Sequence, residues 1–177
     1  SQPFNIELTM IEQYALARSM MMKTVETFLP HADKLVLAGA PGNHGEASRS
    51  QKGQVVTNRL DNTDTMHLQI CEEIMKANPD RYSRVEVNVP TGFHQTLVIK
   101  GKTVAFTHGH MTGGAGNPEV KIEKWWKGQM YGWLPVGDAE ILVTAHYHHL
   151  RMKQQGDRTW FQACLLYTSD AADDLLC

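Results

Sequence analysis

The chain has 177 residues, of which 42% are hydrophobic and 20% are charged, and its formal net charge is −2. This length suits one domain with a sizeable core, and the composition is that of an ordinary globular protein. No stretch approaches the run of about eighteen apolar residues that a membrane span needs, and the small net charge neither favours nor excludes a nucleic-acid partner.

The first part of the chain predicts a helix followed by a buried strand. Apolar residues recur at three- and four-residue spacing over residues 11–29, and a proline follows them. Residues 34–40 form a short apolar run before a Pro-Gly turn, which is typical of a buried strand that leads into a loop. A second helix is expected over residues 63–77, capped by Asp61 or Asn62.

Helices and strands continue to alternate toward the C-terminus. Asn117, Pro118 and Glu119 place a cap, a first-turn proline and a first-turn acid in the right order to begin a helix. Alternation or short apolar runs predict strands at residues 85–89, 95–99, 102–107, 140–145, 150–154 and 158–163. Helices and strands mixed in one unit predict α/β or α+β layers.

The C-terminal run from Cys164 to Asp174 resembles the translation of a sequencing-library adapter. We therefore interpret residues 1–163 as a partial domain and residues 164–177 as a non-native tail, with a genuine acidic tail as the alternative. Without the three aspartates of this tail, the formal net charge of −2 becomes +1.

Most of the nine histidines are grouped directly after predicted strands. The six grouped residues are His44, His108, His110, His146, His148 and His149. Loops at strand ends present side chains to a common cleft, and imidazole is the commonest protein ligand for divalent transition metals. We therefore predict a shared metal site, and we expect His31, His67 and His94 to be ordinary surface or core residues.

Asn43 stands beside the first of these histidines, in the run Gly42-Asn43-His44-Gly45-Glu46. Asparagine tolerates unusual backbone angles, so a turn alone would explain it. The adjacent His44 has no turn-forming role, which favours a place for Asn43 in the metal site.

Three segments resemble, in order, the signature blocks of the calcineurin-like metallophosphoesterases. They are Pro41–Glu46 (PGNHGE), Thr107–His110 (THGH) and Thr144–His148 (TAHYH). The likeness covers roughly residues 30–163. It is closest to phage-type proteins related to DNA-repair exonucleases, because the helix with Trp125 and Trp126 and the segment before the last block are also similar to that group. It implies an α/β sandwich of two mixed sheets flanked by helices, incomplete in this chain.

The resemblance implies two divalent metal ions and their ligands. Asn43, His108 and His146 would bind the second ion, and His148 would bind the first. The two ions would clamp a phosphate and activate a bridging hydroxide that attacks phosphorus. Ligands of nitrogen and oxygen without thiolate favour manganese, with iron or zinc as alternatives. The three cysteines lack C-x-x-C spacing, which predicts no disulfide framework and a reducing cytoplasm.

The same resemblance gives His44 a catalytic role without metal binding. It would contact the phosphate and protonate or stabilise the leaving oxygen. His110, His149 and Glu46 have no assigned ligand role and are candidates for orienting the ligands.

The substrate class is left open among several phosphoesters. The phage-type resemblance favours DNA and an exonuclease, and Lys121, Lys124 and Lys127 would touch a phosphate backbone or form a solvated helix face. Trp125, Trp126 and Trp133 would stack on bases or belong to the core. The alternatives are a small-molecule phosphodiesterase, a phosphoprotein phosphatase or a non-catalytic metal-binding module.

The chain departs from the family at its first two blocks. The family begins with an Asp-x-His block and a Gly-Asp block, whereas no Asp here stands two residues before a His. These blocks would lie upstream of the first helix, so we expect the chain to be cut at both ends. Our hypothesis is that this polypeptide is inactive and that its parent gene encodes an active hydrolase.

Overall fold

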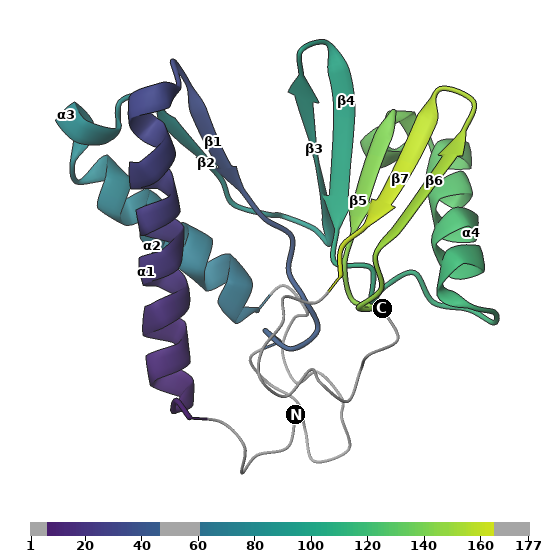
Figure 1. Ribbon diagram of the computed structural model, residues 1–177, viewed down its shortest axis with the longest axis horizontal. Helices are drawn as coiled ribbons and strands as arrows, with labels where there is room; N and C mark the ends of the chain where they lie inside the picture. Colours follow the sequence, from purple (N-terminus) through teal and green to yellow (C-terminus); the bar gives the residue numbers. More distant parts are fainter. Residues whose placement is uncertain (1–6, 47–60, 165–177) are drawn as a thin grey trace.

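The computed structural model describes residues 7–46 and 61–164, which fold around two β-sheets (Figure 1). The helices are α1 (Met10–Phe28), η1 (Leu29–His31), α2 (Thr63–Lys76), α3 (Pro79–Tyr82), α4 (Pro118–Tyr131) and η2 (Pro135–Asp138). The strands are β1 (Leu35–Ala38), β2 (Val85–Asn88), β3 (His94–Ile99), β4 (Lys102–Thr107), β5 (Ile141–Thr144), β6 (Arg151–Gln155) and β7 (Arg158–Gln162). The predicted α/β class is confirmed.

Asparagine side chains begin two of the long helices. Asn62 caps α2, where its side-chain oxygen accepts a hydrogen bond from the Asp64 backbone N–H at 2.9 Å. This bond makes Asn62 the cap, because its side chain satisfies an unpaired donor of the first turn. Asn117 caps α4 in the same way, accepting from the Val120 N–H at 3.0 Å, as the sequence predicts.

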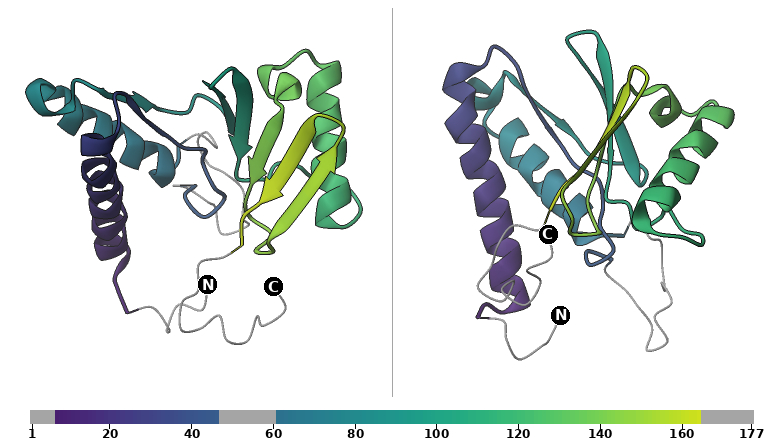
Figure 2. Two further views of the ribbon diagram at one scale, coloured as in Figure 1. Left: turned by 45° about the horizontal axis from the view of Figure 1, so that its top comes forward. Right: turned by 45° about the vertical axis from the view of Figure 1, so that its right-hand side comes forward.

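The first half of the molecule is built on a short parallel sheet. β1 pairs with β2 from Leu35–Val85 to Ala38–Asn88. Helices α1, α2 and α3 pack around this pair of strands (Figures 1 and 2). The core between them consists of Val25, Leu29, Cys71, Met75 and Tyr82. This half therefore has its own hydrophobic core.

The second half is a mixed sheet of five strands in the order β3-β4-β5-β7-β6. The outer pairs β3–β4 and β6–β7 are antiparallel hairpins, whereas β5 runs parallel to both β4 and β7. Helix α4 and η2 cover one face of the sheet (Figure 2). The core on this face contains Ala105, Ile122, Val136, Ala139, Leu142 and Trp160.

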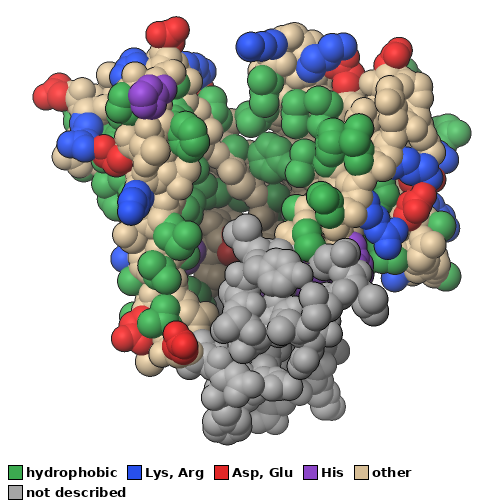
Figure 3. All heavy atoms as spheres, in the orientation of Figure 1, with side chains coloured by type: hydrophobic (Ala, Val, Ile, Leu, Met, Phe, Trp, Pro, Cys, Tyr) green, Lys and Arg blue, Asp and Glu red, His purple; other side chains and the backbone are tan. Residues whose placement is uncertain are grey.

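The opposite face of the five-stranded sheet carries exposed apolar side chains. Val143, Phe161 and Met152 lie in one row across β5, β7 and β6, because each is paired with the next in register. Hydrophobic side chains gather on this half beside the hollow that separates it from the first half (Figure 3). The two sheets therefore stand apart rather than closing face to face.

The sequence misplaces or misses a few local features. The turn between β6 and β7 is the pair Gly156-Asp157 rather than three residues, since Gln155 is still paired with Arg158. The short helices α3 and η2 were not predicted, because each is a single turn that begins at a proline, too short for a periodic pattern. Within the described residues, no helix is both long and apolar enough to cross a bilayer. The predicted tail lies outside the described residues from residue 165 onward.

Candidate metal centre

The parallel pairing of β4 and β5 brings two predicted ligands together. Thr107 and Thr144 are opposite each other at the ends of the two strands, and the Ala145 N–H donates to the His108 carbonyl at 3.1 Å one step further on. Because parallel strands end at the same edge of a sheet, the next side chains lie side by side. The ring centroids of His108 and His146 are 5.1 Å apart.

Gly109 turns the chain so that a third imidazole returns to this edge. Its φ of 101° is a conformation that residues with a side chain rarely adopt. The His110 ring then lies 5.3 Å from that of His108 and 6.2 Å from that of His146. Its Nε2 is 3.8 Å from Glu46 Oε1, and both side chains are buried.

The loop after β5 holds two histidines in the left-handed region. The φ angles are 72° at His146 and 55° at His148, and the Tyr147 N–H donates to the Ala145 carbonyl at 2.9 Å. Such angles cost on the order of 1–3 kcal/mol each for a residue with a side chain, and they cluster at functional sites. A hydrogen bond from the segment after β7 supports this conformation, since Cys164 Sγ donates to the His148 carbonyl at 3.2 Å.

Asn43 reaches the same cluster from the other half of the molecule. Its Oδ1 lies 2.9 Å from His108 Nε2. The loop that carries Asn43 follows β1, as predicted, whereas His108 follows β4. This contact therefore joins the two sheets at the predicted site.

The first turn of α2 holds the Asn43 loop in place. Asn62 Nδ2 donates to the Gly42 carbonyl at 2.7 Å, and the Gly42 N–H donates to Asp64 Oδ2 at 2.8 Å. The Thr63 N–H also donates to the Gly45 carbonyl at 2.7 Å. A Cβ at Gly45 would lie 2.2 Å from Asn62 Oδ1, so glycine is required for this close approach.

Burial and neighbouring imidazoles keep the central histidines neutral. Burial first, and then repulsion from His110, His146, His44 and His148, together lower the pKa of His108 to about 4. Burial also lowers the pKa of His146, with repulsion from His148, His44 and Lys121. A neutral imidazole keeps one lone pair for metal binding, and Nε2 would supply it once its proton, which forms the hydrogen bond to Asn43 Oδ1, moves to Nδ1.

The remaining histidines divide into exposed and packed positions. His44 and His148 are exposed, although both act electrostatically on His108. The backbone carbonyl of His149 accepts from Gln162 Nε2 at 2.7 Å, which fixes the loop. His67 packs against Tyr14 and His94 against Trp125, at ring-centroid distances of 5.4 Å and 6.0 Å, and His31 is an exposed surface residue.

Two residues that support the site were not predicted to do so. Asn62 was expected only as a possible helix cap and Asp64 was given no role, yet both bind the backbone of the Asn43 loop. The run Asp61-Asn62-Thr63-Asp64 contains more carboxylate and amide groups than one cap requires, which was the available signal.

The donor chemistry of the cluster fits a divalent metal ion. Among residues 7–46 and 61–164, no three His, Cys, Asp or Glu side chains are already arranged to hold an ion. However, Asn43 Oδ1 and His108 Nε2 converge at 2.9 Å, and other imidazoles lie beside them. Nitrogen and oxygen donors of this kind suit manganese, iron or zinc.

Comparisons with known proteins give only distant similarities. No protein-family model and no curated protein sequence matches the chain. Among solved structures, a Vps29 mutant from Entamoeba histolytica is 16% identical, with 77% of each chain covered and a TM-score of 0.34. A predicted phosphoesterase from Streptococcus pneumoniae is 12% identical, with 55% of this chain and 65% of that chain covered and a TM-score of 0.32. Wild-type Vps29 from Entamoeba histolytica, solved in complex with zinc, is 14% identical, with 73% and 72% covered and a TM-score of 0.33. Likenesses this weak establish no relationship.

Proposed function

We propose that the histidine cluster is the metal centre of a phosphoester hydrolase, and that the enzyme is a phosphodiesterase acting on DNA. The observation that supports this most directly is the convergence of strand-end loops from both sheets. Asn43 Oδ1 lies 2.9 Å from His108 Nε2, and the His108 and His146 rings are 5.1 Å apart. A purely structural cluster would not need loops from two sheets to converge, nor a left-handed backbone at both His146 and His148.

Four side chains would hold two divalent cations. Asn43, His108 and His146 would bind one ion and His148 the other, with manganese favoured over iron or zinc. Bound cations of this kind neutralise phosphate oxygens and lower the pKa of a bound water. The chain supplies His108 as a neutral ligand because burial lowers the pKa of its imidazole to about 4.

His44 would contact the phosphate and protonate the leaving oxygen. Its imidazole is exposed, yet it lies close enough to lower the pKa of both His108 and His146 by repulsion. An exposed imidazole can exchange its proton with solvent between turnovers. Proton transfer by a positioned side chain contributes typically about 10²–10⁴-fold to a rate.

DNA is the proposed substrate, and Lys121 supports it. This lysine is close enough to His146 to lower the pKa of that imidazole, so a cation stands beside the cluster to attract a phosphate backbone. A small-molecule phosphodiester or a phosphoprotein would present the same phosphate. DNA binding that weakens steeply with salt would favour the nuclease over these alternatives.

A non-catalytic metal-binding module is the second candidate. It is favoured by the blocks that this sequence lacks, because no Asp here stands two residues before a His as the first ligand block of the resembling family requires. We accordingly propose that this chain alone does not hydrolyse phosphodiesters. Hydrolysis of bis(p-nitrophenyl) phosphate by the purified chain with added Mn²⁺ would contradict that part of the proposal.

Metal and phosphate binding test the site without requiring turnover. Equilibrium dialysis against Mn²⁺ should give binding to the wild-type chain and to a His31→Ala control. His108→Ala and Asn43→Ala should each weaken it at least about tenfold, as expected for lost ligands. The Mn²⁺-loaded chain should also broaden the ³¹P signal of inorganic phosphate, and His44→Ala should reduce that broadening while leaving Mn²⁺ bound.

Two results would overturn the proposal. Equal Mn²⁺ affinity in the wild type and His108→Ala would show that the cluster does not hold the ion. Bound Mn²⁺ with no effect on the phosphate signal would favour the non-catalytic module.

A further inference from the structure

A cavity of about 500 Å³ lies beside α4, at the other end of the five-stranded sheet from the histidines. Arg158, which lines it, begins β7, whereas Gln162 at the end of β7 is paired with Thr144 next to the cluster. Four residues of a strand separate the two positions by roughly 13 Å along the sheet. The cavity is therefore a second site, distinct from the proposed metal centre.

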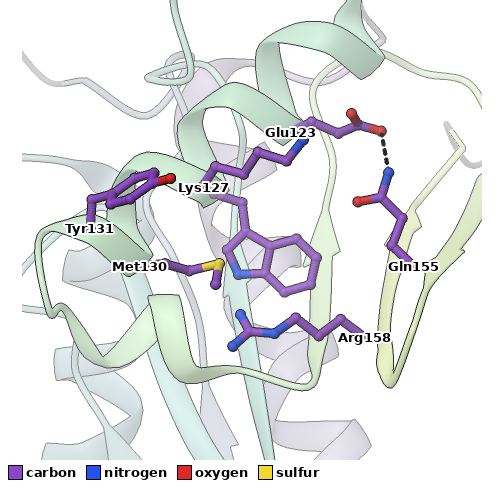
Figure 4. A pocket seen from close by; sticks show the side chains of 7 residues that line it. Glu123, Lys127, Met130, Tyr131, Gln155 and Arg158 are labelled. Atoms are coloured by element: carbon purple, nitrogen blue, oxygen red, sulfur yellow. Dashed lines mark hydrogen bonds between the residues drawn. The ribbon is translucent and has the colours of Figure 1, made fainter.

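One face of α4 forms most of this cavity. Glu123, Trp126, Lys127, Met130 and Tyr131 recur at three- and four-residue spacing and line it. The facing wall comes from the β6–β7 hairpin, where Gln155 and Arg158 stand opposite the helix (Figure 4). The site is thus built from two rigid elements.

Trp126 provides a fixed planar surface inside the cavity. Its indole Nε1 donates to the Val136 carbonyl at 2.9 Å, and the side chain packs against the core of the second half. The Arg158 guanidinium lies 5.8 Å from the indole centroid and donates to the Gly137 carbonyl. Both groups are therefore oriented before any ligand arrives, which lowers the entropy cost of binding.

The cavity is lined by two cationic side chains, Lys127 and Arg158, and by one carboxylate, Glu123. Glu123 is paired with Lys153 and accepts a hydrogen bond from Gln155 at 3.3 Å (Figure 4). Lys127 is exposed and makes no ion pair within residues 7–46 and 61–164. Lys127 and Arg158 therefore place two cationic groups beside the apolar side chains that line the cavity.

Exposed apolar side chains extend the indole surface outward. Met130 is 43% exposed and Tyr131 is 87% exposed, although both line the cavity. Apolar and aromatic walls with a few fixed polar groups are typical of small-ligand sites of this size. Aromatic rings exposed beside cations are also the combination that binds unstacked nucleotides.

We propose that this cavity binds a nucleotide unit, with the base against Trp126 and Tyr131 and the phosphate against Lys127 and Arg158. The unit is either a free mononucleotide or one residue of single-stranded DNA. Base–aromatic stacking contributes about 1–3 kcal/mol per base and does not depend on sequence, so the site would accept any base. The inference does not depend on the metal centre, because it uses none of the histidines.

Binding should be measured by fluorescence anisotropy of a labelled dT oligonucleotide, with EDTA present so that the histidine cluster plays no part. Lys127→Glu should weaken binding at least about tenfold, since it reverses the charge that meets the phosphate. The matched control is Lys124→Glu, the same charge reversal at an exposed position of α4 that does not line the cavity. It should change the affinity less than about twofold.

A second pair of variants tests the aromatic part of the site. Tyr131→Ala should weaken binding several-fold, whereas Trp133→Ala should not, although Trp133 is 90% exposed and close in sequence. Nuclear magnetic resonance of the tryptophan indole N–H groups gives a direct reading. Addition of dAMP or the oligonucleotide should shift the Trp126 signal and leave the Trp133 signal unchanged.

The outcomes separate the two sources of the nucleotide. Full displacement of the oligonucleotide by dAMP identifies a mononucleotide site, and displacement by unlabelled oligonucleotide alone identifies a site for a strand; either supports the proposal. Equal losses in Lys127→Glu and Lys124→Glu would overturn it, as would equal competition by inorganic phosphate. Absence of binding by both probes at about 1 mM would also overturn it.

Discussion

The two sides of the histidine cluster are held by different means. His108 and His146 extend two neighbouring parallel strands, and the hydrogen-bond ladder continues past the strand ends through Ala145. Asn43 lies instead on a loop that is fixed by the first turn of α2 and by the absence of a side chain at Gly45. The sheet side is thus placed by continuous pairing, and the loop side by a few individual contacts.

This difference predicts which side fails first. The hydrogen bonds of a strand ladder strengthen one another, whereas the Asn43 loop depends on a small set of separate contacts to Asn62 and Asp64. Changes near α2 should therefore displace Asn43 and leave the His108–His146 pair intact. On the sheet side, the stability of the protein should instead depend on the protonation of His108 and on the left-handed backbone of His148.

The largest expected effect is that of Gly45→Ala. The new Cβ would lie 2.2 Å from Asn62 Oδ1, and Asn62 is buried, so its amide must leave its place. We expect a loss of about 3–4 kcal/mol in the free energy of unfolding from overpacking and the broken cap. Urea denaturation measures this loss, and Gly92→Ala is the control because its Cβ would meet nothing within 4 Å. Equal stability of the two variants would contradict the account of the loop.

The second-largest expected effect is a loss in the free energy of unfolding at acidic pH, which His108 on the sheet side would cause. Burial lowers the pKa of His108 to about 4 from an ordinary 6.5, so protons bind the unfolded chain more tightly than the folded one. Stability is therefore fully present above pH 6.5 and is lost as the pH falls toward 4, by at most about 3 kcal/mol. Unfolding free energies of the wild type and His108→Gln across this range measure it. A wild-type slope no steeper than that of the variant would refute the prediction.

Asn62→Ala should have an intermediate effect. It removes the cap of α2 and leaves the Gly42 carbonyl without its buried donor. A lost cap costs about 1 kcal/mol and an unsatisfied buried group about 1–3 kcal/mol, so we expect a total near 2 kcal/mol. Asn117→Ala at the equivalent position of α4 is the control, because that cap is exposed and holds no loop. Asn117→Ala should lower the free energy of unfolding only by the contribution of the lost cap, about 1 kcal/mol, and should not change Mn²⁺ affinity.

The smallest effect should be a gain in stability. His148 has a φ of 55°, and asparagine tolerates this left-handed conformation better than histidine. His148→Asn should therefore stabilise the chain by about 1 kcal/mol while weakening metal binding. A thermal melt alongside Mn²⁺ dialysis measures both. Reduced stability in this variant would show that the loop is not strained.

The sequence predicted those parts that depend on local pattern. The starts of α2 and α4 follow from their capping residues, and His108 and His146 were expected together because each directly follows an apolar strand. The pairing of β5 with β7 and the wide separation of the two sheets depend on contacts distant in sequence. They could not be read from periodicity.

The site shows the same limit. Asn43 was recognised beside His44, but the hold of Asn62 and Asp64 on its loop involves residues about twenty positions away. The contact between His110 and Glu46 likewise joins two strand-end loops from different sheets. Residue type was enough to identify the candidate metal ligands. Only the tertiary structure identified the side chains that hold the loops of these ligands in place.

The most direct test of the central claim is a crystal structure with Mn²⁺ and its anomalous scattering. We predict an anomalous peak within coordination distance of both Asn43 Oδ1 and His108 Nε2, with His146 nearby. Such a peak would show that the two sheets jointly hold the ion. A peak bound by the histidines without Asn43, or no peak in the cluster, would contradict the claim.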